Sequence, residues 1–285
     1  TFPFITAGIE QVSNLFDENL SFHRDMLDNK IHSNDVECAK SLNHWKHGEK
    51  YVHDEFTYEK LYNKMISMTE PYFLITHTGS SHYNYPIKDG FKPKDKISKE
   101  ERYYYSLKYA DQTLRKFFDR IKKHPTYKNT IFILISDHTA GRNHYSLYDK
   151  YHIPALVYAP GIISAGEINK PTFQCDIGPT ILDILNIDGN YTTFGTSAFQ
   201  KNLPQRGMIL PDWDGYLVFV YDPYIAKVDV NKVYEIYNFR QNKERNQINN
   251  PDMINKIKDI HQEFLKTYQF FADNIYGNKL LPLAK

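Results

Sequence analysis

The chain has 285 residues, of which 41% are hydrophobic and 24% charged, and its formal net charge is +1. This length is sufficient for one large domain, or for a large and a small lobe, around a buried core. A net charge this close to zero excludes a broad positive electrostatic potential that would bind nucleic acid or an anionic membrane. Any phosphate recognition must therefore be local. No apolar run reaches the ~18 residues of a membrane-spanning helix, and two cysteines define neither a disulfide framework nor a zinc cluster.

Short apolar runs predict buried strands in the first part of the chain. They cover residues 2–6, 72–76, 130–136 and 155–158. Between them, an apolar stripe opposite charged residues predicts a helix over 101–123, and a weaker pattern predicts one over 55–68. A third helix opens at Gly178-Pro179-Thr180 and continues to Leu185. Strands that alternate with helices favour an α/β fold with a mainly parallel central sheet flanked by helices.

After Gly195 the pattern changes to closely spaced strands with turn residues between them. These strands cover residues 208–210, 216–221, 225–230 and 233–237. They predict a small C-terminal antiparallel sheet, followed by a terminal helix over 251–272. We therefore expect a core over residues 1–195, with the strands and helix of residues 196–285 packed on it.

The most informative segment is the apolar strand that ends in Ser136-Asp137-His138. In open α/β sheets, ligands bind at the carboxyl ends of strands. A carboxylate oxygen and an imidazole nitrogen together suit zinc or manganese. Alternatively, Asp137 only caps the following turn and His138 is a surface residue.

A second apolar strand, residues 73–76, runs into a loop that carries His77 and His82. Histidines can donate a hydrogen bond to a phosphoryl or sulfuryl oxygen, or protonate a leaving group near neutral pH. Two strand ends that both deliver histidine into loops indicate a shared site. His144 and His152 follow Asp137 and His138 along the chain. Each is either a site residue or an ordinary core or surface histidine.

Near the start of the chain, Phe22-His23-Arg24-Asp25 places a guanidinium beside an aromatic ring. Arginine grips phosphate or sulfate oxygens through two parallel hydrogen bonds. The alternative is a surface ion pair between Arg24 and Asp25.

The ordered set of motifs resembles the alkaline-phosphatase/sulfatase superfamily, and within it the lipoteichoic acid synthase and phosphoglycerol transferase group. The resemblance is carried by residues 77–82, 136–138, 151–161 and 176–185, and by 233–239 with Asn246. It implies an alkaline-phosphatase-like fold. It also implies that Asp137 and His138 bind one divalent metal ion, with manganese expected first and zinc, magnesium or calcium as alternatives.

The same resemblance implies roles for the other polar residues. His82 matches a histidine that contacts the transferred group, and the spacing of His77 and His82 is similar to that in phosphoethanolamine transferases. Arg24 corresponds to an arginine that holds the substrate phosphate, while Phe22 stands where the family has a tryptophan lining the glycerol pocket. His144 resembles a second histidine after the metal pair, although the loop length differs.

In this family the nucleophile and a further acidic metal ligand lie on earlier strands. Thr1 has some likeness to a nucleophile turn, but residues 1–8 look more like the later strand that precedes the Arg-Asp segment. We therefore expect a C-terminal portion of a longer enzyme that lacks its nucleophile and is inactive alone.

The resemblance implies a metal-dependent phosphodiester transferase or hydrolase that works through a covalent intermediate on an upstream threonine. Its partners would be a phospholipid head group, glycan or sulfate ester and no nucleic acid, outside the cytoplasm, with a membrane tether upstream of this chain. The alternatives are a sulfatase, a phosphoethanolamine transferase, or a catalytically dead binding module of the same fold.

Overall fold

A computed structural model of the protein describes residues 53–82, 85, 91, 97–140, 146–189, 191–201, 205–212 and 214–277, and the backbone of residues 9–13. It divides into two compact units. The first comprises Thr1–Ile131 with Ala159–Ile162, and the second Phe132–Tyr158 with Ile163–Lys285. The expected boundary at residue 195 lies inside the second unit and stays a prediction.

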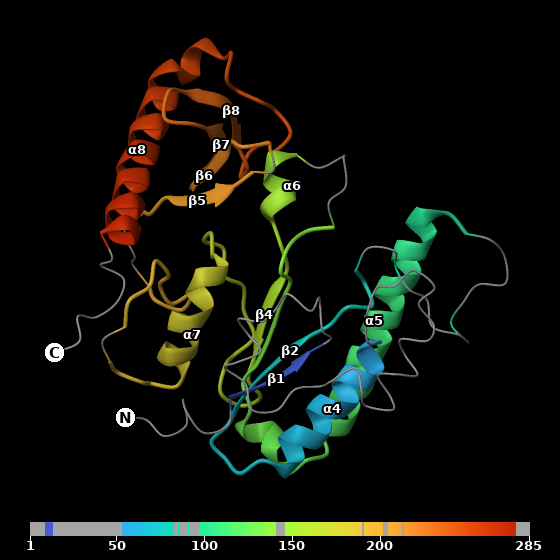
Figure 1. The fold of residues 1–285 in the computed structure, drawn as a ribbon. Coiled ribbons are helices and arrows are strands. Elements are labelled where there is room, and N and C mark those ends of the chain that lie inside the picture. The colour runs from blue at the N-terminus through green and yellow to red at the C-terminus, as the bar shows by residue number, and fades with distance from the viewer. Residues whose placement is uncertain are drawn as a thin grey trace. The chain divides into compact units, whose positions relative to one another are not determined.

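In the residues of the first unit that the structure describes, a parallel strand pair lies with two helices (Figure 1). Strand β1 (Ile9–Ser13) runs parallel to β2 (Phe73–His77), with Ser13 opposite His77. The helices are α4 (Asp54–Ser67) and α5 (Lys99–Ile121), and the short η1 (Pro125–Asn129) follows them. The strand predicted over residues 2–6 lies outside the described residues, and β1 was not anticipated.

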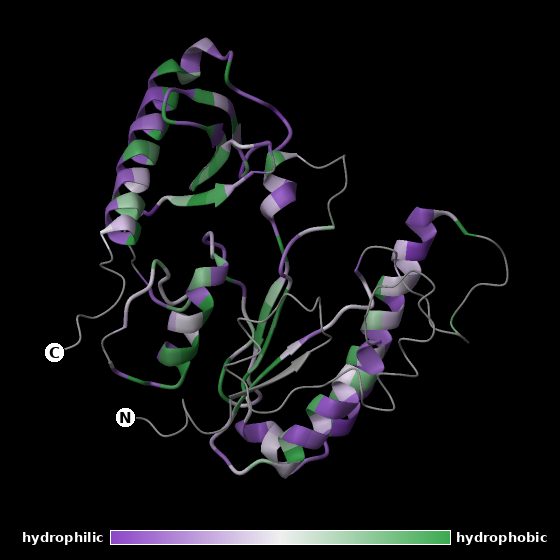
Figure 2. Ribbon diagram, in the orientation of Figure 1, coloured by the Kyte–Doolittle hydropathy of each residue, from purple (hydrophilic) through white to green (hydrophobic). Residues whose placement is uncertain are grey.

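Helices α4 and α5 pack against each other, each along one stripe of buried residues. Both helices carry hydrophobic and hydrophilic residues (Figure 2). Tyr58 of α4 stacks on Phe117 of α5, with ring centroids 5.3 Å apart. Helix α5 begins with a capping box, in which Ser98 and Glu101 satisfy each other's backbone N–H groups. The inward face of α5 runs through Tyr109, Phe117 and other residues four apart, so Leu107, expected on that stripe, is exposed.

The second unit begins with an antiparallel strand pair, an arrangement that the expectation of a mainly parallel sheet left unspecified. Strands β3 (Phe132–Ile135) and β4 (Ala155–Tyr158) pair antiparallel. A parallel pair needs a crossover that lies across the sheet. The described residues of this connection form the five-residue helix α6 (Leu147–Tyr151), whose Leu147 packs with residues of the C-terminal sheet instead. The chain therefore returns to β3 from the opposite direction.

A buried carboxylate organises the segment that follows β4. The short η2 (Gln174–Asp176) leads into helix α7 (Ile177–Ile184). Asp176, 1% exposed, accepts hydrogen bonds from the backbone N–H groups of Phe173 and Thr196, each at 2.8 Å, and pairs with Arg206. Because three donors surround the Asp176 carboxylate, its buried charge is compensated. Its bonds also join Thr196, in the loop after α7, to Phe173, just before η2.

The C-terminal sheet is the antiparallel meander that the sequence predicts. Its order is β5 (Met208–Pro211), β6 (Leu217–Tyr221), β7 (Tyr224–Val228) and β8 (Val233–Asn238). The turn into β6 uses Gly215 at φ +85°, a conformation that favours glycine. Asn246 ties the loop after β8 back to the sheet, because its side-chain oxygen accepts from the N–H of Ile236 at 3.2 Å.

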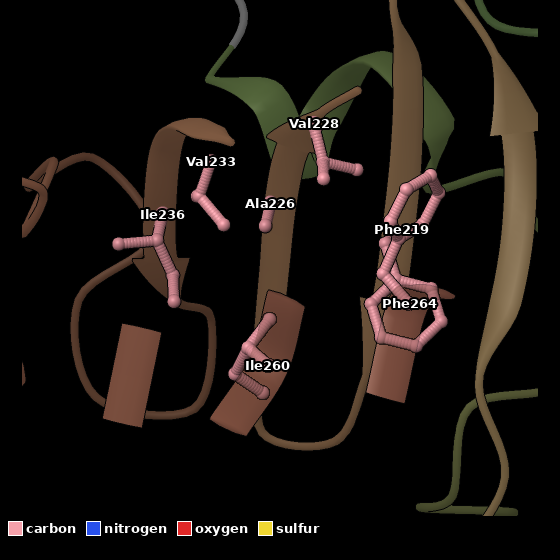
Figure 3. Packing of buried hydrophobic residues seen from close by; sticks show 7 residues of the cluster. All are labelled: Phe219, Ala226, Val228, Val233, Ile236, Ile260 and Phe264. Atoms are coloured by element: carbon pink, nitrogen blue, oxygen red, sulfur yellow. The ribbon is translucent and has the colours of Figure 1, made fainter. Parts of the chain in front are cut away.

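The terminal helix α8 (Ile254–Tyr276), preceded by η3 (Pro251–Met253), covers one face of this sheet (Figures 1 and 3). Ile260 and Phe264 point from α8 into a cluster with buried strand residues, namely Phe219, Ala226, Val228, Val233 and Ile236. On the opposite face, Val218, Val220 and Ile225 pack with Leu147 of α6. Successive residues of β6 thus enter opposite faces, as strand geometry requires, and both faces are buried. In the described part of the chain, no helix is long and apolar enough to cross a bilayer.

Candidate active site

Asp137 and His138 follow the last residue of β3, at the carboxyl end of the strand. Their side chains are 58% and 68% exposed, and Asp137 Oδ2 lies 3.4 Å from His138 Nε2. Two exposed donors that are this close can bind the same ion, since metal ligands sit within a few ångströms of one another.

The hydrogen bonds around this pair engage Asp137 Oδ1 and His138 Nδ1, and leave Asp137 Oδ2 and His138 Nε2 facing each other. His138 Nδ1 lies 2.7 Å from the carbonyl oxygen of Thr139, and Asp137 Oδ1 accepts from the N–H of His138 at 2.8 Å. A ring N–H donated to a carbonyl assigns the tautomer in which Nε2 carries the lone pair, as metal-binding histidines require. The donor set therefore fits a divalent transition metal, with two of its ligands present. Among the residues that the structure describes, no third histidine, cysteine or acid joins them.

A glutamine that the sequence analysis did not single out holds the end of β3. Gln174 Nε2 donates to the carbonyl oxygens of Ser136, at 3.0 Å, and Asp137, at 2.8 Å. On the other side, the N–H of Ser136 donates to the carbonyl of Pro154 at 3.3 Å. The backbone that carries the pair is thus fixed from two directions.

We expect Gln174→Ala to weaken metal binding by the pair roughly tenfold, because outer partners of metal ligands contribute about 10- to 100-fold to affinity. Isothermal titration of the metal-stripped protein with Mn²⁺ would measure the change. Gln269→Ala is the matched control, since the Gln269 side chain bonds Asp273 within α8. Equal affinity in both variants would contradict a role for Gln174 at this strand end.

The histidine pair of the first unit lies at the end of β2. His77 is the last residue of the strand, and His82 closes a turn in which its N–H donates to the carbonyl of Gly79 at 3.0 Å. A further bond from the N–H of Tyr85 to the carbonyl of His82, at 2.8 Å, continues the turn. Both histidines are half-buried, so each is sheltered but within reach of a ligand.

Asp54, the first residue of α4, supports this turn and was also missed by sequence reasoning. Its Oδ1 accepts from the N–H groups of Gly79, at 3.0 Å, and Ser80, at 2.9 Å. In return the N–H of Asp54 donates to Ser80 Oγ at 2.9 Å. Burial raises the pKa of the Asp54 carboxyl, while the bonds from Ser80 and Gly79 and the charge of His77 oppose that rise.

Several of the other predicted site residues lie outside the part of the chain that the structure describes. Phe22, Arg24 and His144, and also Thr1, lie outside the described residues. His152 ends helix α6, with its ring 4.7 Å from that of Tyr148 between centroids, which is the ordinary structural role considered for it. The two histidines of the first unit and the metal pair of the second belong to different units, so their convergence on one centre stays a prediction.

The fold is similar to that of two solved structures. A protein in the alkaline phosphatase superfamily from Vibrio parahaemolyticus superposes with a TM-score of 0.64 at 22% identity, over 93% of this chain and 65% of that one. The lipoteichoic acid synthase LtaP from Listeria monocytogenes gives a TM-score of 0.67 at 18% identity, over 95% of this chain and 71% of that one. The predicted alkaline-phosphatase-like fold is thus confirmed.

The chain belongs to the Sulfatase family, whose model matches residues 6–187. Among curated relatives, lipoteichoic acid synthase 1 of Bacillus subtilis (strain 168) is 27% identical over 161 residues. That match covers 49% of this chain and 25% of the relative. The chain therefore spans about a quarter of the length of this relative, and the suspected family is confirmed.

Proposed function

We propose that the protein is a metal-dependent phosphodiester transferase or hydrolase of the phosphoglycerol-transferase type. The observation that carries the proposal is the Asp137–His138 pair, with Oδ2 and Nε2 3.4 Å apart and the other imidazole nitrogen engaged by a carbonyl. The similarity of this chain to a lipoteichoic acid synthase favours a phosphodiester over other esters as the substrate.

The reaction would proceed in two steps. The hydroxyl of an upstream threonine attacks the phosphorus, the ester bond to the leaving alkoxide breaks, and a covalent phosphoryl-threonine forms. Water or an acceptor hydroxyl then attacks that phosphorus and releases the threonine. Water as acceptor makes the protein a hydrolase, and a glycan or lipid hydroxyl makes it a transferase.

Each site residue has a role in these steps. Asp137 and His138 would hold one divalent ion, manganese first, which supplies charge neutralisation at the phosphoryl oxygens. His82 and Arg24 would donate hydrogen bonds to the remaining oxygens as preorganised groups. Phe22 would line the pocket for the glycerol moiety.

The leaving alkoxide needs a proton donor, and His77 or His144 would supply the proton. A substrate of this class would be a phospholipid head group or a glycan. By its similarity to lipoteichoic acid synthases, we propose that the protein acts outside the cytoplasm. Sulfate ester hydrolysis is the second candidate, because the matching family is the Sulfatase family.

The test uses the full-length gene product, stripped of metal and then given Mn²⁺, Zn²⁺, Mg²⁺ or Ca²⁺. Each form is assayed on a chromogenic phosphodiester and on a chromogenic sulfate ester. We expect metal-restored phosphodiester cleavage, with Mn²⁺ most effective. Turnover of the sulfate ester alone would move the protein to the second candidate, and turnover of neither would indicate a binding module.

A further inference from the structure

The turn that carries His82 is held by a carboxylate from another element. Asp54 is 1% exposed, and Ser80, its partner, is also 1% exposed. Two successive backbone N–H groups, of Gly79 and Ser80, converge on one oxygen of Asp54, and the N–H of Asp54 returns a bond to Ser80 Oγ. These three bonds, each at 2.9–3.0 Å, join residues 25 and 26 positions apart in the sequence.

The hydrogen bonds to Asp54 differ in kind from those that a neutral capping residue would accept. A carboxylate that accepts from two N–H groups makes charge-assisted bonds, which are roughly twice as strong as neutral ones. Asp54 also lies in the first turn of α4, where the helix dipole favours a negative charge. A buried carboxyl costs free energy unless it is fully bonded, so a neutral capping residue would have met the structural need at less cost.

The reciprocal bonds also fix where the histidines stand. Gly79 and Ser80 lie between His77 and His82, and the Gly79 carbonyl accepts the N–H of His82. An electrostatic interaction links Asp54 to His77 itself. The carboxylate therefore contacts the turn in its middle and influences the histidine at its start.

We propose that Asp54 is a positioning residue, which holds the Gly79–His82 turn so that His77 and His82 keep one fixed spacing at the transferred group. This inference rests on the proposed function, because it assumes that the two histidines act on substrate. Displacement of a positioned group by about 1 Å can cost about 100-fold in rate. We therefore expect Asp54→Ala to lower kcat about 100-fold with a small change in KM.

Two variants with smaller structural effects keep the proposal testable if Asp54→Ala does not fold. Asp54→Asn keeps an oxygen that can accept from both N–H groups, so it is expected to lower kcat about tenfold or less. Ser80→Ala removes the return bond and the hydrogen bond of the Ser80 side chain to the Asp54 carboxyl, but keeps both backbone N–H bonds, and is expected to have a similar small effect. Leu61→Ala is the matched control, since Leu61 is buried in the same helix and away from the turn; it should lower stability while leaving kcat per folded molecule unchanged.

A double-mutant cycle separates positioning from stability. The full-length, metal-loaded protein is assayed on the chromogenic phosphodiester with Asp54→Ala, His82→Ala and the double variant. If Asp54 acts through the turn, its substitution costs less once His82 is absent than in the wild type, because only the position of His77 then still depends on it. Additive losses, or an Asp54→Asn variant as slow as Asp54→Ala at equal folded fraction, would overturn the proposal.

The same set of assays distinguishes this proposal from the proposed function. A wild-type protein that cleaves no phosphodiester removes the function and the positioning role together. A His82→Ala variant with full activity leaves phosphodiester cleavage standing and overturns the role of His82 and, with it, the positioning role. An active wild type that depends on His82 but not on Asp54 leaves the proposed function standing and overturns only the role of Asp54.

Discussion

Asp137→Ala is expected to abolish metal-dependent turnover, with kcat/KM at least about 1,000-fold below that of the wild type. A Lewis-acidic ion contributes several kcal/mol to phosphoryl transfer, and each 1.36 kcal/mol is about tenfold in rate. Loss of about 4 kcal/mol therefore corresponds to about three orders of magnitude. The carboxylate is 58% exposed, so its removal should leave the fold intact.

The measurement combines kinetics on the phosphodiester with metal content by mass spectrometry. Asp137→Ala and His138→Ala should each lose bound metal, whereas Asp137→Asn keeps the size of the side chain and tests its charge. Asp188→Ala is the control, because Asp188 is an exposed aspartate of the same unit. Full metal occupancy and full activity in Asp137→Ala would place the metal centre elsewhere.

Elements with a strong local signal could be predicted from the sequence. The helix expected over 101–123 is α5, because its stripe and the Ser98 capping box both act within a few residues. The strand expected over 155–158 is β4 with the same bounds. The antiparallel direction of β4 could not be predicted, since it depends on where α6 packs, and a five-residue helix carries little periodicity.

The residues of the candidate site also fall into those that the sequence predicts and those that it does not. Asp137, His138, His77 and His82 stand out because a ligand type follows an apolar strand directly in the sequence. Asp54 and Gln174 act on backbone groups of segments 25 to 38 residues away, so only the folded chain brings them to the site. A residue that contacts main-chain atoms leaves no motif at its target, because every residue there offers the same N–H and C=O groups.

The second large effect concerns stability, and we expect Phe264→Ala to cost about 3–5 kcal/mol, as removal of a buried phenylalanine does. Phe264 is fully buried, and its ring meets that of Phe219 edge to face with centroids 5.7 Å apart. It joins α8 to the centre of the C-terminal sheet (Figure 3). Truncation leaves a cavity between helix and strands that neighbouring β-branched residues cannot fill without moving the backbone.

Amide hydrogen exchange of β6–β8 measures this effect without requiring the two units to unfold together. We expect the most protected amides of these strands to exchange roughly 160-fold to 5,000-fold faster in Phe264→Ala, which is the fold-change that about 3–5 kcal/mol gives. Phe270→Ala is the matched control, because Phe270 lies on the same helix but is 57% exposed, and its loss should change protection far less. Equal protection in both variants would mean that the sheet does not depend on α8. A large difference would show that this helix is an integral part of the C-terminal core, since a peripheral helix could lose a ring without opening the strands beneath it.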